Sequence, residues 1–262
     1  MNNIGIILFD IDGVIRDVSH SYRLAIKKTV EKFCGYEPST YNIDELKNEG
    51  IWNNDWDLSL ELIKRFKKEN NSYLDIPTRK EIIEIFERLY FGCNPNKDWK
   101  EWTGFIKNEK IIVEKDLFKL LTLNKIVWGF VSGAEKPSAL FVLEERLKLK
   151  NVPLIAMGDA PDKPNPEGFI SLARELSDYE LGVKSPPIAY VGDTIADVKT
   201  ISNAREQIPS QEFISIAVTP PHLQIESNYK ERLHYEENLK FAGADYILQS
   251  VNDIKNLYPN LF

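Results

Sequence analysis

The feature that most constrains this chain is an alternation of short apolar runs with longer amphipathic stretches. The apolar runs are bounded by Asp, Gly, Pro or Ser, and we expect each to form a β-strand. They are Gly5–Phe9, Ile126–Val131, Pro153–Met157, Ile188–Val191, Phe213–Val218 and Tyr246–Leu248. Continuous apolar strands are typical of a parallel sheet that helices cover on both faces. The alternation therefore predicts an α/β fold with a doubly wound parallel sheet.

One long interval breaks this alternation directly after the first strand. Between about Asp17 and Asn108 the sequence reads as helices joined by loops. A clear example is Asp57–Lys68, where the apolar side chains fall on one face of a helix. We therefore expect a helical insert, and we divide the chain into an α/β core of residues 1–15 and 105–262 and a helical domain of residues 16–104.

Composition narrows the class of protein. The 262 residues include 33 Lys and Arg against 40 Asp and Glu, so the net charge is −7 and predicts little attraction for nucleic acid or anionic membranes. Apolar runs stay well short of the ~20 residues of a membrane helix, and the N-terminus carries no basic leader of a signal peptide. Two cysteines give no disulfide scaffold. We expect a cytoplasmic protein, with its oligomeric state left open.

Two carboxylates, Asp10 and Asp12, follow the first strand and precede Gly13. The carboxyl ends of parallel strands border the ligand crevice of such a sheet, so this pair concentrates negative charge there. Mg²⁺, which prefers oxygen ligands, would offset that charge. A strand end closed by an Asx turn is the structural alternative. The pair by itself leaves both interpretations open.

Three further strand ends carry polar groups. Ser132 and Gly133 follow the second strand, where a hydroxyl and backbone N–H groups can bind a phosphate. Lys163 lies in a proline-bracketed loop, Asp193 follows a later strand, and Asp197 lies one turn into the next helix. Each has an ordinary structural explanation, namely a turn, a solvated lysine or a charge that favours a helix N-terminus. Their order at successive strand ends instead indicates one site.

These four motifs together resemble those of the haloacid dehalogenase superfamily. The motifs are Asp10-x-Asp12-Gly13, Ser132-Gly133, Lys163-Pro164 and Gly192-Asp193-x-x-x-Asp197. The resemblance covers nearly the whole chain and implies a Rossmann-like core with the insert as a helical cap, since the thirty residues between Ser132 and Lys163 leave no room for a larger α/β cap. Within the family, the Lys163–Pro166 stretch is similar to the phosphoglycolate phosphatase and β-phosphoglucomutase branch.

The resemblance implies catalytic and phosphate-binding roles. Asp10 would be the nucleophile that forms an aspartyl-phosphate, and Asp12 would protonate the leaving oxygen and then activate water. Ser132, the backbone of Gly133 and Lys163 would hold the phosphoryl oxygens. These groups suit phosphoryl transfer, which depends on positioning and charge neutralisation.

The resemblance also implies a cofactor, Mg²⁺, bound by Asp10, the backbone carbonyl of Asp12, and Asp193. Asp197 would orient Lys163 or a metal-bound water from outside the first coordination shell. The implied function is a Mg²⁺-dependent phosphatase that hydrolyses a small phosphorylated metabolite.

Several alternatives remain beside this function. A phosphomutase acting on a sugar phosphate has the same core, and a non-catalytic module that binds a phosphorylated ligand would have lost a motif residue, which this chain has not. Haloalkanoate dehalogenation needs neither a metal nor Asp12. Phosphonate hydrolysis would use a cap lysine such as Lys27, Lys28 or Lys47, and nothing in the sequence marks one of them. Nucleotide-binding loops and a G-x-S-x-G elbow are absent from the sequence.

Substrate specificity is expected to reside in the cap. Asn53, Asn54 and Trp56 could bind a sugar or a small polar group, and Arg16 could meet a second anionic group. The structural alternatives are a helix N-cap at Asn54, a tryptophan in the cap core, and a hinge charge at Arg16.

Overall fold

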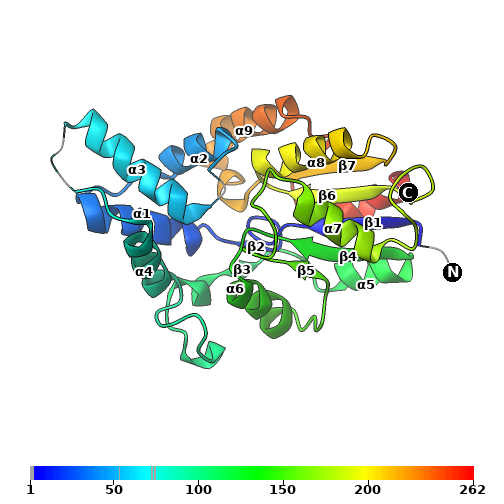
Figure 1. Ribbon diagram of the computed structural model, residues 1–262, viewed down its shortest axis with the longest axis horizontal. Helices are drawn as coiled ribbons and strands as arrows, with labels where there is room; N and C mark the ends of the chain where they lie inside the picture. The colour runs from blue at the N-terminus through cyan, green and yellow to red at the C-terminus, as the bar shows by residue number, and fades with distance from the viewer. Residues whose placement is uncertain (1–2, 53, 72, 74) are drawn as a thin grey trace. The chain divides into compact units, whose positions relative to one another are not determined.

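The computed structural model describes residues 3–52, 54–71, 73 and 75–262 (Figure 1). It divides into two compact units: Met1–Asp17 with Ile111–Phe262, and Val18–Lys110. The chain leaves the first unit through β2 (Arg16–Asp17) and returns through β3 (Lys110–Ile111), and these two strands form a small sheet of their own. Among the described residues, no helix combines the length and apolar character needed to cross a bilayer.

The first unit contains a six-stranded sheet in the order β5-β4-β1-β6-β7-β8 within the described part of the chain. Its strands are β1 (Gly5–Phe9), β4 (Ile126–Val131), β5 (Leu154–Ile155), β6 (Ile188–Gly192), β7 (Phe213–Val218) and β8 (Tyr246–Leu248). Every neighbouring pair is parallel. The predicted doubly wound α/β fold is confirmed, and each strand lies where its apolar run predicts it, although β5 is shorter than expected.

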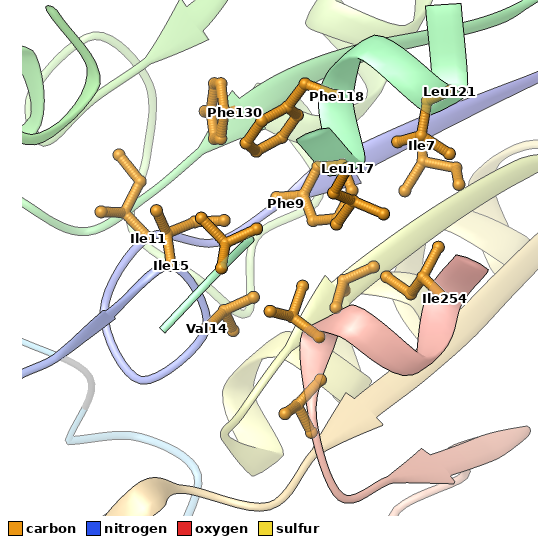
Figure 2. Packing of buried hydrophobic residues seen from close by; sticks show 14 of the residues in the cluster. Ile7, Phe9, Ile11, Val14, Ile15, Leu117, Phe118, Leu121, Phe130 and Ile254 are labelled. Carbon is orange, nitrogen blue, oxygen red and sulfur yellow. The ribbon is translucent and has the colours of Figure 1, made fainter. Parts of the chain in front are cut away.

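Helices bury both faces of this sheet (Figure 1), and Figure 2 shows the packing on one of them. They are α5 (Asp116–Leu123), α6 (Lys136–Leu140) continued by a π-helix (Phe141–Arg146), α7 (Glu167–Leu176), α8 (Ile195–Gln207), α9 (Tyr229–Phe241) and α10 (Ile254–Leu257). Ile7 and Phe9 pack in a core cluster with α5 and α10, whereas Ile6 and Leu8 pack with α7 and α8. Because successive residues of a strand point to opposite faces, β1 must be apolar throughout.

The register of the strands brings the motifs to one edge of the sheet. Phe9, the last residue of β1, lies opposite Phe130 on β4 and Val191 on β6. The three strands therefore end nearly level, and their polar loops start side by side. β1 is also the central strand from which the order runs outward in two directions, which is where ligands bind in open α/β sheets.

The second unit is helical. Its elements are α1 (Tyr22–Cys34), α2 (Thr40–Asn48), α3 (Asp55–Glu69), α4 (Arg79–Tyr90) and two 3₁₀ helices, Trp99–Glu101 and Phe105–Asn108. Tyr22 stacks on Phe86 and Tyr90 in its core. The unit runs from Val18 to Lys110 rather than from residue 16 to 104, because the 3₁₀ helix Phe105–Asn108 packs on α1 and α4.

Candidate active site

The loop Asp10–Arg16 is a tight turn closed by backbone hydrogen bonds. The amide of Asp10 donates to the Val191 carbonyl at 2.8 Å, and the amide of Gly13 donates to the Arg16 carbonyl at 2.9 Å. Gly13 has φ +76°, and a Cβ there would lie 2.0 Å from Oδ2 of Asp193. Glycine is therefore required at this position, both for the left-handed backbone and for the close approach of the Asp193 carboxylate.

Lys163 joins the loops at three strand ends. Its Nζ lies 3.1 Å from Oδ2 of Asp10 and 2.5 Å from Oδ1 of Asp197, and it donates to the Tyr190 hydroxyl at 3.0 Å. The lysine side chain is only 6% exposed, and both carboxylates are buried. One buried ammonium thus faces two buried carboxylates, so removing the ammonium would leave both carboxylates without a compensating charge.

Burial and the charges around Lys163 together determine the pKa shifts of Asp10, Asp197 and Lys163. Burial raises the pKa of the Asp10 carboxyl to about 6, and Lys163 opposes this shift only in part. Burial acts in the same sense on Asp197, but Lys163 and the Thr194 hydroxyl outweigh it and hold the pKa of Asp197 below its ordinary value. Asp197 is the better compensated of the two because it lies closer to Lys163. Burial would lower the pKa of Lys163, yet the two carboxylates raise it well above its usual value.

The donor set at this site fits a hard divalent cation. Carboxylate oxygens of Asp10, Asp193 and Asp197 all lie within 4.8 Å of one another. Oδ1 of Asp10 is buried and accepts no hydrogen bond from the described residues, which is costly for a carboxylate oxygen. A bound cation would satisfy this orphaned atom, and oxygen ligands of this kind suit Mg²⁺.

Ser132 and Gly133 lie on the wall of a cavity that also reaches Lys163. The remaining wall is formed mainly by residues 155–162. The Ser132 side chain is buried, and its hydroxyl oxygen accepts from the amide of Ala134 at 3.2 Å. The structure therefore places the three predicted phosphate-binding residues on one cavity, and one of them, Lys163, also contacts Asp10.

Sequence reasoning missed three supporting residues. Thr194 caps α8, and its amide and hydroxyl both donate to Oδ2 of Asp197. The Tyr190 hydroxyl donates to the Val131 carbonyl at 2.7 Å, and the Tyr235 hydroxyl donates to the Asp193 carbonyl at 3.1 Å. The spacing of Thr194 and Asp197 is a capping-box signal that was available in the sequence. Tyr190 was also detectable, as the one side chain with a hydroxyl in the apolar run Ile188–Val191.

The side chains of the described residues that were predicted to determine substrate specificity contact other groups of the protein. Arg16 is completely buried, and its guanidinium donates to Asp12 and Ser138; its contact with a second anionic group of a substrate stays a prediction. Asn54 is the N-cap of α3, where its side chain accepts from the amides of Trp56 and Asp57 at 3.1 and 3.3 Å. The Arg79 guanidinium lies 5.2 Å from the Trp56 ring centroid. Asn53 lies outside the described residues.

Asn54→Ala is expected to lower the free energy of unfolding by about 1 kcal/mol, because two amides of the first turn of α3 lose their acceptor. Asn54→Asp keeps an acceptor oxygen and should restore most of the loss. Chemical denaturation of the three proteins measures the difference. Equal stability of the alanine and aspartate variants would show that the cap is not stabilising.

Comparisons with known proteins agree with this geometry. Residues 4–205 match the haloacid dehalogenase-like hydrolase family. A curated relative named imidazoleglycerol-phosphate dehydratase, from Phytophthora nicotianae, is 31% identical over 194 residues, which are 73% of this chain and 40% of the relative. The chain thus spans about two-fifths of the length of that relative.

Two solved structures share the fold. A phosphonoacetaldehyde hydrolase-like protein from Oleispira antarctica has a TM-score of 0.70 at 16% identity, covering 99% of this chain and 93% of that chain. Phosphatase Tt82 from Thermococcus thioreducens has a TM-score of 0.56 at 22% identity, covering 90% and 99%. The family match spans most of the chain and includes all four motifs, from Asp10 to Asp197. The protein is a hydrolase of the haloacid dehalogenase-like family.

Proposed function

We propose that this hydrolase is a phosphatase that acts on a small phosphomonoester through an aspartyl-phosphate on Asp10. The observation that carries the proposal is the buried Lys163, which faces the Asp10 carboxylate and lines the same cavity as Ser132 and Gly133. A carboxylate nucleophile needs a cation to approach a phosphate dianion, and a phosphate needs donors on its oxygens. Both requirements are met by residues of one unit of the chain.

In the first half of the reaction, a carboxylate oxygen of Asp10 attacks phosphorus and forms a new P–O bond. The bond from phosphorus to the ester oxygen breaks, and its electron pair goes to the leaving oxygen. Asp12 gives that oxygen a proton, so an alcohol departs. Lys163, Ser132 and the backbone of Gly133 would hold the phosphoryl oxygens during the transfer.

In the second half, the Asp12 carboxylate takes a proton from water as the water oxygen attacks phosphorus. The bond from phosphorus to Asp10 breaks, its electron pair returns to the carboxylate, and inorganic phosphate leaves. The enzyme therefore has the same protonation state before and after one turnover, and water is the only other reactant.

Asp10, Asp193 and the backbone carbonyl of Asp12 would hold Mg²⁺, since Asp197 already accepts from Lys163 and Thr194. When bound, Mg²⁺ would neutralise negative charge on Asp10 and on the phosphoryl group. The orphaned Oδ1 of Asp10 is the observation that favours this assignment.

We also propose that the helical unit, Val18–Lys110, serves as the cap, because it is inserted between the first two motifs. Phosphonate hydrolysis through a cap lysine is less well supported. Lys47 pairs with Asp55, and Lys28 pairs with Glu31 and Glu37. The hydrogen bonds that Lys28 donates to these two glutamates raise the pKa of Lys28, whereas imine formation needs a lysine that is readily neutral.

The test is turnover of a panel of phosphomonoesters with Mg²⁺: an aryl phosphate, sugar phosphates, phosphoglycolate and imidazole-bearing alkyl phosphates. The last group is included because the curated relative is named for such a compound. We expect release of inorganic phosphate, its loss in EDTA, and its recovery when Mg²⁺ is added back. Unchanged turnover in EDTA would contradict the metal assignment. Conversion of a sugar phosphate to its isomer without phosphate release would instead indicate a phosphomutase.

A further inference from the structure

Arg16 is a buried charge at the end of the first loop. Its side chain has no exposed surface, and it is among the largest fully buried side chains of the described chain. An arginine keeps its charge in any protein environment, so complete burial is costly unless good partners surround it. The catalytic scheme above gives this residue no role, and its partners show what it does.

The guanidinium of Arg16 connects the first loop to α6. Its Nε donates to Oδ1 of Asp12 at 2.6 Å, and its Nη2 donates to Oγ of Ser138 at 2.7 Å. Ser138 is itself fully buried. The guanidinium is planar and rigid, so anchoring one nitrogen on Ser138 fixes the direction of the nitrogen that faces Asp12.

The backbone of Arg16 is fixed as well. Its amide donates to the Ile11 carbonyl at 3.1 Å, and its carbonyl accepts from Gly13 at 2.9 Å. The Asp12 side chain, in contrast, is 25% exposed. The ion pair therefore joins a carboxyl group that solvent can reach to a guanidinium that is completely buried.

We propose that Arg16 is a positioning residue for phosphoryl transfer: it fixes the Asp12 carboxyl group in the orientation from which that group gives its proton to the leaving oxygen. Ser138 supports Arg16 in this role. The inference rests on the proposed phosphatase function and adds to it a residue pair from outside the four motifs. Proton transfer requires heavy atoms within hydrogen-bond reach, so a misoriented acid loses most of its effect.

The readout that separates this role from a purely structural one is the dependence on the leaving group. 2,4-Dinitrophenyl phosphate releases a stable anion that needs no proton, whereas an alkyl phosphate releases a poor leaving group that does. The quantity to measure is kcat/KM with Mg²⁺, because it reports the steps up to the first cleavage of the ester bond and not the later hydrolysis of the aspartyl-phosphate.

Arg16→Met should lower kcat/KM for the alkyl phosphate roughly 10-fold to 100-fold, and for the dinitrophenyl ester less than about 3-fold. Ser138→Ala, which keeps the ion pair and is less disruptive to folding, should show the same selectivity with a loss of about 3-fold to 10-fold. The matched control is Arg23→Met, which removes another buried arginine, paired with Asp44 at 2.6 Å in the helical unit. The control should leave the ratio between the two substrates unchanged.

Thermal unfolding identifies the variants that remain folded at the assay temperature, and if Arg16→Met does not, Ser138→Ala carries the test. Equal losses on both substrates, or faster turnover of the alkyl phosphate, would overturn the positioning role.

Asp12→Asn distinguishes a failure of this inference from a failure of the proposed function. It removes the proton donor itself and should show the same selective loss on the alkyl phosphate. If it does and the Arg16 and Ser138 variants do not, the inference fails and the proposed function stands. If the parent protein turns over neither ester, the proposed function fails and the inference fails with it.

Discussion

Asp10→Asn is expected to lose turnover roughly 10⁴-fold or more, because an amide cannot supply the attacking carboxylate oxygen. The same substitution should not unfold the protein. Asn has nearly the same shape as Asp, and the position is buried between elements that the backbone already fixes. The assay is single-turnover release of phosphate from an aryl phosphate. Retained turnover in a variant that melts like the parent would mean that another residue is the nucleophile.

In EDTA, Asp10→Asn should also be more stable than the parent at neutral pH. The pKa of Asp10 is about 6 in the folded chain and about 3.9 in an unfolded one, so the folded state disfavours the charged form. The resulting cost is fully present above pH 6 and disappears as the pH falls towards 4. It amounts to at most roughly 3 kcal/mol.

Thermal melts at pH 7.5 and pH 4.5 measure this difference. The gain from Asp10→Asn should be visible at the higher pH and nearly absent at the lower one. Asp178→Asn, the same substitution at an exposed carboxylate that accepts from Asn3, is the matched control. A gain of equal size at both pH values would contradict the raised pKa of Asp10.

Lys163→Met is expected to remove activity and to destabilise the fold by about 3–5 kcal/mol at neutral pH. The substitution leaves the buried carboxylates of Asp10 and Asp197 without their shared cation, and the Tyr190 hydroxyl without a donor. Loss of a donor to the phosphoryl group should lower kcat by about 10²-fold to 10³-fold or more. Phosphate release and chemical denaturation measure the two effects separately.

The stability loss in Lys163→Met should shrink in acid. Lys163 lowers the pKa of Asp197, and that stabilisation is present above the unfolded pKa of a carboxyl group and lost as the pH falls through the lower folded value. Lys163 itself stays charged throughout this range. The control is Lys136→Met, which breaks an exposed pair with Asp159 at 3.3 Å and should cost less than about 1 kcal/mol. Similar losses in the two variants would show that the buried network contributes little.

The strands could be predicted from the sequence because a strand that is buried on both faces is recognisable from its own residues. A strand covered on both faces must be apolar at every position, and this makes β1, β4, β6 and β7 visible as continuous runs. The C-terminal boundary of the helical unit could not be predicted in this way. Phe105–Asn108 belongs to that unit because it packs on α1 and α4, and nothing in its own sequence indicates those partners.

In the candidate site, too, some features could be predicted from the sequence and others could not. Strand ends determine where Asp10, Ser132 and Asp193 lie, because parallel strands in register place their following residues at one edge. The partners of these residues depend instead on elements far apart in the chain. Arg16 lies 122 positions from Ser138, and Lys163 lies 34 positions from Asp197.

The sequence by itself determined the alternating strands, the place of the helical insert and the carboxylates at the strand ends, since each depends on hydrophobic periodicity or on residues adjacent to a strand. Only the tertiary structure decided that Arg16 turns inward to Asp12, and that Lys163 meets the carboxylates of Asp10 and Asp197, which lie far from it in the chain. An arginine after a strand is equally compatible with a solvated and a buried position. The choice is made by the buried hydroxyl of Ser138 and the carboxylate of Asp12, which together compensate the charge.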